Sequence, residues 1–245
     1  MHILAIDTSS AWCSVALSMA DKAPLLRHEA VSSGASQLVL PWIDELLAEA
    51  NIPLASIDAI AIDVGPGAFT GVRLGIAVVQ GLAIGAQVPV IPVASLDALA
   101  LQLTQTPRFT LSQARNFVIA LDARMDEIYW ARFEMMGNAL PVRVGEIHLS
   151  KPEELNLHEV HFLAGSAIKE YGERLFSNSN FKLTSEYLDD EIGISALGIL
   201  EVAKMDLSKG KQISVSQLEP LYIRNKVALT TDERVSNSRS SISSL

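Results

Sequence analysis

Apolar positions in the first part of the chain change from the period of strands to the period of a helix. Residues 2–7, 12–18 and 25–31 are enriched in apolar side chains and separated by short polar turns, which predicts three strands. Over residues 35–50, apolar side chains recur at helical spacing while the acidic residues lie on another face. We therefore predict an amphipathic helix there.

A glycine-rich turn follows the next apolar segment. Residues 57–64 predict a buried strand, and the sequence DVGPGAFTGVRLG then begins at Asp63. Gly65 and Gly67 allow a tight turn, and Thr70 is the expected N-cap of a helix that ends near residue 86. Because a helix start exposes N–H groups, this turn is a candidate anion site. It lacks the Lys-Ser/Thr pair of a P-loop.

Four glycines recur along this second helix, at positions 71, 75, 81 and 85. Each costs about 1 kcal/mol relative to alanine, so we expect another backbone to pack very close. The helix is also apolar on nearly every side, and a sheet covers only one of them. We expect a protein partner to cover the rest, the simpler alternative being that both helices only cover the sheet.

The second half of the chain repeats the opening pattern. The apolar segment 117–122 ends in Asp122, as the first strand ends in Asp7, and 127–133, 141–149 and 161–165 predict further strands. Helices are expected over 166–176 and near 194–205, and the less regular segment 102–115 is the expected crossing between halves. We predict an α/β duplication with subdomains at 1–104 and 105–228, followed by a disordered serine-rich tail at 229–245.

Composition and charge exclude several classes of protein. A net charge of −9 without a Lys/Arg cluster argues against nucleic-acid binding by this chain alone. The single cysteine, Cys13, excludes an internal disulfide and is expected to be a small buried hydrophobe. Residues 74–96 are uncharged and long enough to span a bilayer, but Pro89 and Pro92 interrupt them. The sequence therefore predicts a cytoplasmic protein without a membrane span.

Asp7 and Asp122 end the first strand of each half, where actin-like ATPases and sugar kinases hold metal-bound phosphate. Neither following turn contains the glycine that such sites use, so the alternative role of Asp7 is to cap its hairpin. The sequence contains no G-x-S-x-G or H-E-x-x-H motif. The candidate phosphate or nucleotide contacts are Asp7, Thr8, Gly65, Gly67, Thr70 and Arg73.

Several segments together resemble the TsaB family, over about residues 1–228. They are LAIDT at residues 4–8, GPGAFTGVRLG at 65–75, QGLA at 80–83, LDARM at 121–125 with EIYW at 127–130, and EPLYIRN at 219–225. The resemblance implies an actin-like (ASKHA) duplication of two RNase H-like β-β-β-α-β-α units. It also implies a non-catalytic scaffold that activates TsaD, the transferase that makes threonylcarbamoyladenosine in tRNA.

Further expectations follow from this resemblance. TsaD-like proteins carry H-x-x-x-H where this chain has SGASQL at residues 33–38, so no metal ligand and no catalytic residue is expected. The first two helices are expected to bind TsaD or a second copy of the chain. TsaE is expected to join through the complex with TsaD, and the chain is expected to contact tRNA only as part of that complex. No intrinsic cofactor is implied, and if the assembly holds a nucleotide, the boundary with the partner is the expected place. The expected interface residues are Leu38, Trp42, Leu46, Gly71, Leu74, Gly75, Val78, Gly81 and Gly85.

A different class of function stays open from the residues alone. Asp7 and Asp122 would then serve an actin-like ATPase or a small-molecule phosphotransferase.

Overall fold

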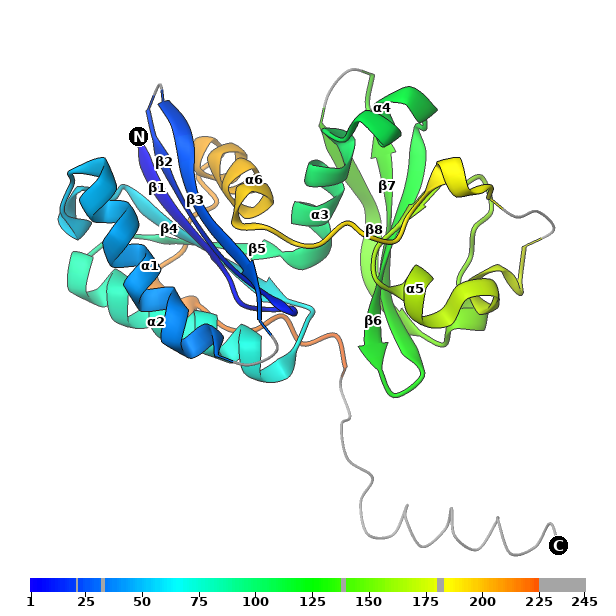
Figure 1. Ribbon diagram of the computed structural model, residues 1–245, viewed down its shortest axis with the longest axis horizontal. Helices are drawn as coiled ribbons and strands as arrows, with labels where there is room; N and C mark the ends of the chain where they lie inside the picture. Colours follow the sequence, from blue (N-terminus) through cyan, green and yellow to red (C-terminus); the bar gives the residue numbers. More distant parts are fainter. Residues whose placement is uncertain (21, 32–33, 138–139, 180–182, 225–245) are drawn as a thin grey trace, which may run out of the picture.

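The computed structural model has two lobes, each built around a five-stranded sheet (Figure 1). It describes residues 1–20, 22–31, 34–137, 140–179 and 183–224. The tail predicted to be disordered, 229–245, lies outside the described residues.

The first sheet has the strand order β3-β2-β1-β4-β5. β1, β2 and β3 are antiparallel neighbours, whereas β4 and β5 extend the sheet in parallel with β1. The predicted strands and both predicted helices are confirmed. The elements are β1 (His2–Asp7), β2 (Trp12–Met19), β3 (Lys22–Ala30), α1 (Ala35–Ala50), β4 (Ala59–Gly65), α2 (Phe69–Ala86) and β5 (Val90–Ala94).

The second sheet repeats the first in the order β8-β7-β6-β9-β10. Its first three strands are antiparallel, and β9 and β10 again extend it in parallel. The shared order confirms that the two halves are copies of one unit. The elements are β6 (Asn116–Arg124), β7 (Glu127–Met135), β8 (Pro141–Ser150), β9 (Phe162–Ala164), α5 (Ala167–Tyr171) and β10 (Leu188–Asp189). Short 3-10 turns cover Leu54–Ser56, Pro152–Glu154, Gly172–Phe176, Ser185–Tyr187 and Val215–Gln217.

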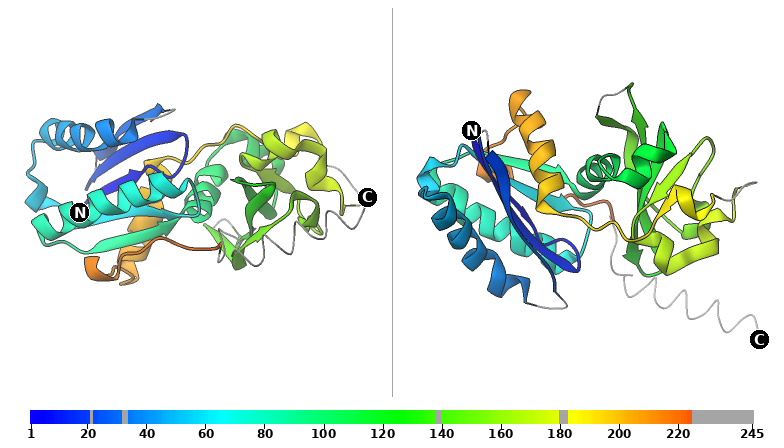
Figure 2. Two further views of the ribbon diagram at one scale, coloured as in Figure 1. Left: turned by 90° about the horizontal axis from the view of Figure 1, so that it is seen from below. Right: turned by 45° about the horizontal axis from the view of Figure 1, so that its top comes forward.

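The connection between the lobes is helical, which corrects the prediction of an irregular crossing at 102–115. α3 (Ser95–Thr104) is followed by α4 (Pro107–Ser112), whose N-cap Thr106 accepts a hydrogen bond from the Phe109 amide. α3 is buried on nearly all sides because it lies between the lobes (Figure 2). A helix buried all round shows no amphipathic pattern, so apolar periodicity does not predict this helix.

α6 (Ala196–Ser208) comes late in the chain but packs on the first sheet, where it contacts all five strands. The segment after it also returns to the first lobe, because Ile213 pairs with Val90 and the Leu221 amide donates to the Val64 carbonyl at 2.8 Å. We call residues 218–224 the C-terminal strap. These segments had been predicted within the subdomain 105–228, whereas the structure packs them against the first sheet.

The two faces of the first sheet belong to separate cores. One core fills the space between this sheet and α1 and α2 on the outer side. The other joins the inner faces of both sheets through α3 and α6, with Phe109, Phe117, Phe133 and Phe162 among its side chains. Cys13 is buried in the first of these cores, which raises the pKa of its thiol to about 12 and confirms it as a small core residue.

Candidate functional site

The glycine turn after β4 is hydrogen-bonded directly to the hairpin turn after β1. The Ala68 amide donates to the Ser9 carbonyl at 2.6 Å, and the Thr8 hydroxyl donates to the Gly71 carbonyl at 2.7 Å. These two turns were the expected walls of a phosphate site. In the structure they contact each other, and an N–H group at the start of α2 is satisfied by the chain itself.

Three of the glycines permit this contact. A Cβ on Gly67 would lie 2.5 Å from the Ser9 carbonyl oxygen, and a Cβ on Gly71 would lie 1.9 Å from that of Thr8. A Cβ on Gly75 would lie 2.8 Å from both the Thr8 hydroxyl and the Ile62 side chain. The close backbone approach predicted for Gly71 and Gly75 is therefore made within the chain, which corrects their assignment to a partner surface.

The other candidate phosphate contacts at this turn have different roles. Gly65 adopts a φ of +99°, which favours glycine, and its amide donates to Asp63. The helix begins at Phe69 with Ala68 as N-cap, so Thr70 lies exposed in the first turn and its prediction as N-cap is wrong. Arg73 donates to the Tyr222 hydroxyl at 2.7 Å, and its guanidinium lies 3.2 Å from the centroid of the Phe69 ring.

Asp7 forms a buried carboxyl pair with Asp63, which lies two residues before the end of the neighbouring strand β4. Both carboxyl groups are almost inaccessible to solvent. Asp63 accepts hydrogen bonds from the Ser9 hydroxyl at 2.6 Å, the Ser95 hydroxyl at 2.7 Å and the Gly65 amide at 2.7 Å. Asp7 accepts from the Ser9 amide at 2.8 Å through Oδ1, while its Oδ2 has no partner among the described groups.

Burial, together with the charge of Asp63, raises the pKa of Asp7 well above its usual value of 3.8. Burial also raises the pKa of Asp63, although its three donors oppose that shift. Of the two carboxyl groups, Asp7 therefore keeps its proton to the higher pH. An enclosed carboxyl with a raised pKa is a poor ligand for the metal ion that such sites hold beside phosphate, and in the structure Asp7 accepts from the Ser9 amide of the hairpin turn.

This pair predicts a defined dependence of stability on pH. Because the folded chain keeps the Asp7 proton to higher pH than the unfolded chain, the free energy of unfolding falls as pH rises from about 3.8 through the raised pKa. Asp7→Asn retains the acceptor for Ser9 and removes this titration, so it is expected to flatten the dependence of the free energy of unfolding on pH.

Asp63→Asn weakens acceptance from three donors and is expected to lower the free energy of unfolding by about 1–3 kcal/mol. Urea unfolding of the three proteins between pH 4 and 8 measures both effects. A steeper fall for Asp7→Asn than for the unmodified chain would contradict the proton assignment.

Asp122 lies at the equivalent point of the second lobe, but it is not buried with a second acid in the way Asp7 is. It accepts from the Arg124 amide at 2.8 Å and from the Tyr171 hydroxyl at 2.9 Å, and it pairs with the Arg124 guanidinium at 3.1 Å. It lines a cleft of about 680 Å³ between the lobes, which Ser9 and Gly67 line from the other side. Asp7 is not part of that lining, so the two acids do not meet in one open site. Among the described residues, no group of three or more His, Cys, Asp or Glu side chains is placed to hold a metal ion.

The predicted interface residues of α1 and α2 separate into two groups. Trp42, Leu46 and Gly75 are buried in the chain, so their prediction as contact residues is wrong. Leu38, Leu74 and Val78 are half-buried, and Gly81 and Gly85 are exposed. No described atom lies within 4 Å of the Cβ that could be added to Gly81 or Gly85.

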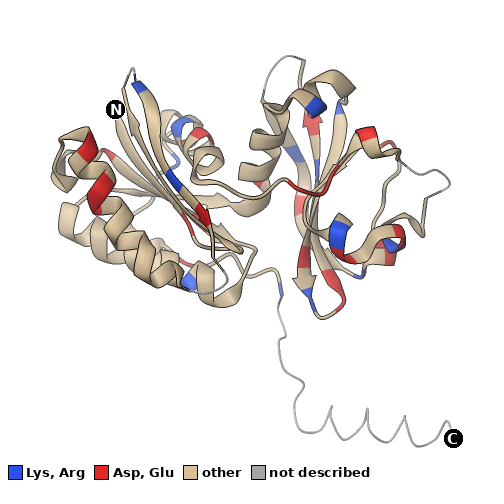
Figure 3. Cartoon of the chain, in the orientation of Figure 1, with Lys and Arg blue, Asp and Glu red and all other residues tan. Residues whose placement is uncertain are grey.

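One stripe of α2 remains open to solvent, and we call it the α2 face. Its residues are Leu74, Ala77, Val78, Gly81, Ile84 and Gly85, which recur at helical spacing. Ile84 is 66% exposed, and sequence reasoning missed it because burial of the opposite face cannot be assigned from an all-round apolar pattern. Figure 3 shows α2 almost free of charged residues, whereas α1 beside it carries several acids.

α2 is also the one helix in the described part of the chain that is long and apolar enough to cross a membrane. Its inner side is attached to the first sheet, because Val72, Ile76, Val79 and Ala83 are buried in the outer core. A helix packed in this way covers a sheet on one side and presents the α2 face on the other.

The shared strand order, the cleft between the lobes and the strand-ending acids define an α/β protein of the actin-like class, a duplication of two RNase H-like units. The family model described as TsaD, tRNA N6-adenosine threonylcarbamoyltransferase, matches residues 29–199. The tRNA threonylcarbamoyladenosine biosynthesis protein TsaB of Haemophilus influenzae is 34% identical, over 93% of this chain and 95% of its own length. The chain belongs to the TsaB family.

Two further relatives agree with this assignment. TsaB of Escherichia coli is 33% identical over 93% of this chain and 96% of its own length. The solved structure of YeaZ from Pseudomonas aeruginosa is 33% identical, covers 91% of this chain and 100% of its own, and superposes with a TM-score of 0.79.

Proposed function

We propose that this protein is a non-catalytic partner of a TsaD-type transferase in the synthesis of threonylcarbamoyladenosine in tRNA. The observation that carries the proposal is the α2 face, an exposed apolar stripe on a helix whose only charged residue is Arg73. Soluble proteins rarely leave such a stripe open unless another protein covers it.

The α2 face suits close packing against helices. Ala77, Gly81 and Gly85 follow one another at four-residue spacing, and small residues at this spacing let two helix backbones approach closely. Ile84 and half-buried Leu74 beside them supply apolar area. Leu40 of α1 is 47% exposed and adds to this area. The same surface can pair with a second copy of the chain, so self-association competes with binding of the transferase. TsaE joins through the resulting complex.

The joint between the two turns supports a non-catalytic role. The Ala68 amide at the start of α2 already donates to the Ser9 carbonyl, and Gly67 and Gly71 lie against the hairpin turn, so these two turns leave no room for a phosphate between them. Asp7 lies enclosed beneath that joint, outside the cleft that Asp122 lines. An ATPase or phosphotransferase that uses both acids is therefore the less supported function.

The net charge of the chain indicates which subunits of the assembly would bind the tRNA. With a net charge of −9, this chain repels RNA, so the transferase and its partners supply the tRNA contacts. The chain needs no cofactor of its own in this role, and any nucleotide lies at the boundary with the partner. The reaction places the protein in the cytoplasm.

A reconstituted modification assay tests this function. It contains the threonylcarbamoyl adenylate synthase, a TsaD-type transferase, TsaE, ATP, substrates and unmodified tRNA, with or without this chain. We expect modified adenosine to form only when the chain is present, and we expect the chain alone to show no turnover. Equal product without the chain would refute an activating role, and ATP hydrolysis by the isolated chain would then be measured.

A further inference from the structure

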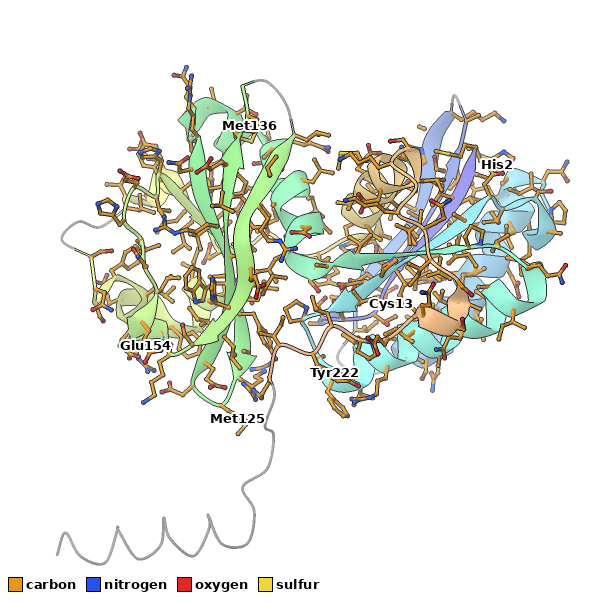
Figure 4. All side chains as sticks on the ribbon, turned by 180° about the vertical axis from the view of Figure 1, so that it is seen from behind. His2, Cys13, Met125, Met136, Glu154 and Tyr222 are labelled. Atoms are coloured by element: carbon orange, nitrogen blue, oxygen red, sulfur yellow. The ribbon has the colours of Figure 1, made fainter. Side chains whose placement is uncertain are left out.

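A second surface feature adjoins α2 at its N-terminal end. A groove of about 400 Å³ lies between the start of α2, the C-terminal strap and the turn that joins β6 to β7. Figure 4 shows Tyr222 on the strap and Met125 at the tip of that turn, on the same side of the molecule. The groove therefore brings together three segments that are far apart in the sequence.

The groove combines an apolar floor with exposed aromatic side chains at its edge. Val64, Val72 and Ile223 contribute to its lining. Phe69 is 63% exposed and Tyr222 is 57% exposed, although both are large side chains that normally gain free energy from burial. Exposed aromatic residues beside arginine are typical of the centre of a protein interface.

Every charged residue that lines the groove is an arginine. They are Arg73, Arg124 and Arg224. This local excess of positive charge contrasts with the chain as a whole, which has 28 acidic and 19 basic residues. Arg124 and Arg224 pair with Asp122 and Glu127, which lie outside the lining, so Arg73 and the exposed Arg124 guanidinium are the groups that make the groove complementary to an anionic ligand.

Arg224 is held in place and still has a donor to offer. It bonds to the Glu127 carboxylate and to the Ala123 carbonyl at 3.2 Å, which fixes the guanidinium at the groove. Its Nε is buried and has no acceptor among the described residues. A ligand acceptor that reached this Nε would satisfy a donor that the described residues leave without a partner.

We propose that this groove receives an acidic, apolar segment of the transferase partner, in which a carboxylate meets the arginines and an aliphatic or aromatic side chain enters between Phe69 and Tyr222. This inference rests on the proposed function. Continuity supports a protein occupant, because Phe69 and Arg73 belong to the first turns of the same helix, directly before the α2 face begins at Leu74. The contact at the groove would add charged interactions to the helix packing at the α2 face.

Affinity measurements with matched variants test the groove. Arg73→Glu reverses one charge at the groove, and Arg115→Glu makes the same change at an exposed site beyond the opposite end of β6. Phe69→Ser removes an exposed aromatic ring, and Leu111→Ser removes an apolar side chain that is 83% exposed on α4. We expect Kd for the transferase to rise at least about 10-fold for both groove variants and less than about 2-fold for both controls. Circular dichroism and thermal unfolding of each variant confirm that it is folded.

Crosslinking identifies the occupant. A photoreactive benzoylphenylalanine at position 69 or 222 is expected to link to an acidic, apolar segment of the transferase. Adducts only with a second copy, with tRNA or with residues 225–245 of the same chain would overturn the proposal. So would equal Kd values for all four variants when the unmodified chain binds, and that result would leave the proposed function intact. No binding by the unmodified chain would overturn both.

Discussion

Gly71→Ala is expected to lower the free energy of unfolding by about 3–5 kcal/mol, the upper range for a single substitution. The added Cβ would lie 1.9 Å from the Thr8 carbonyl oxygen, so α2 must move away from the hairpin. That movement stretches the hydrogen bonds from the Thr8 hydroxyl to Gly71 and from Ala68 to Ser9, and it disturbs the buried acids next to them. Urea unfolding followed by circular dichroism measures the change.

Gly81→Ala is the matched control for this prediction. Gly81 lies in the same helix, but no described atom is within 4 Å of an added Cβ. Replacing glycine by alanine at an exposed helical position is expected to stabilise the fold by about 1 kcal/mol. Equal stability changes at positions 71 and 81 would show that the joint between α2 and the first hairpin is not tight.

Gly81→Trp is expected to abolish partner binding while leaving the fold intact. The indole has open space in the isolated chain, yet it occupies the centre of the α2 face and holds a partner helix away. We expect Kd for the transferase to rise at least about 100-fold, equivalent to roughly 2.7 kcal/mol, and product to be lost in the reconstituted assay. Calorimetric titration gives the affinity, and nucleoside analysis of tRNA gives the product.

Leu111→Trp controls for the effect of adding an exposed tryptophan to a helix. Leu111 is 83% exposed on α4, remote in sequence from α2, and its substitution is expected to change neither affinity nor product. Full activity of Gly81→Trp would place the partner elsewhere on the chain. Gly75→Trp would not serve this purpose, because Gly75 is buried against Ile62 and Thr8 and a large side chain there would disrupt the fold.

Much of the fold was predictable because the spacing of apolar residues changes abruptly where one element ends and the next begins. The amphipathic pattern gave the bounds of α1, and the glycine turn marked the passage from β4 to α2. The apolar segments that lead to Asp7 and Asp122 indicated the duplication, which the equal strand orders confirm, although β6 itself continues to Arg124. α3 was missed because a helix enclosed by two lobes is apolar on every side, like a strand of a buried sheet.

The contacts of the candidate site were less predictable. A glycine indicates that a neighbouring group packs closely against its Cα, but it does not indicate which group that is. Gly71 and Gly81 have similar sequence surroundings. In the structure, however, Gly71 packs against the Thr8 carbonyl, whereas Gly81 is exposed to solvent. Trp42 and Leu46 likewise fit an interface and a core equally well, and the structure assigns them to the core. The pairing of Asp7 with Asp63 depends on two parallel strands becoming neighbours, which no local pattern encodes.

The position of α6 sets an order for folding during synthesis. The first sheet is complete in sequence by residue 94, but the helix that covers its inner face comprises residues 196–208. Until that helix has left the ribosome, the inner face presents Ile3, Ala5 and Ile91 without their final cover. Domains synthesised first usually fold first. In this chain the lobe that is translated first is completed last, because the inner face of its sheet lacks the cover of α6 throughout the synthesis of the second lobe.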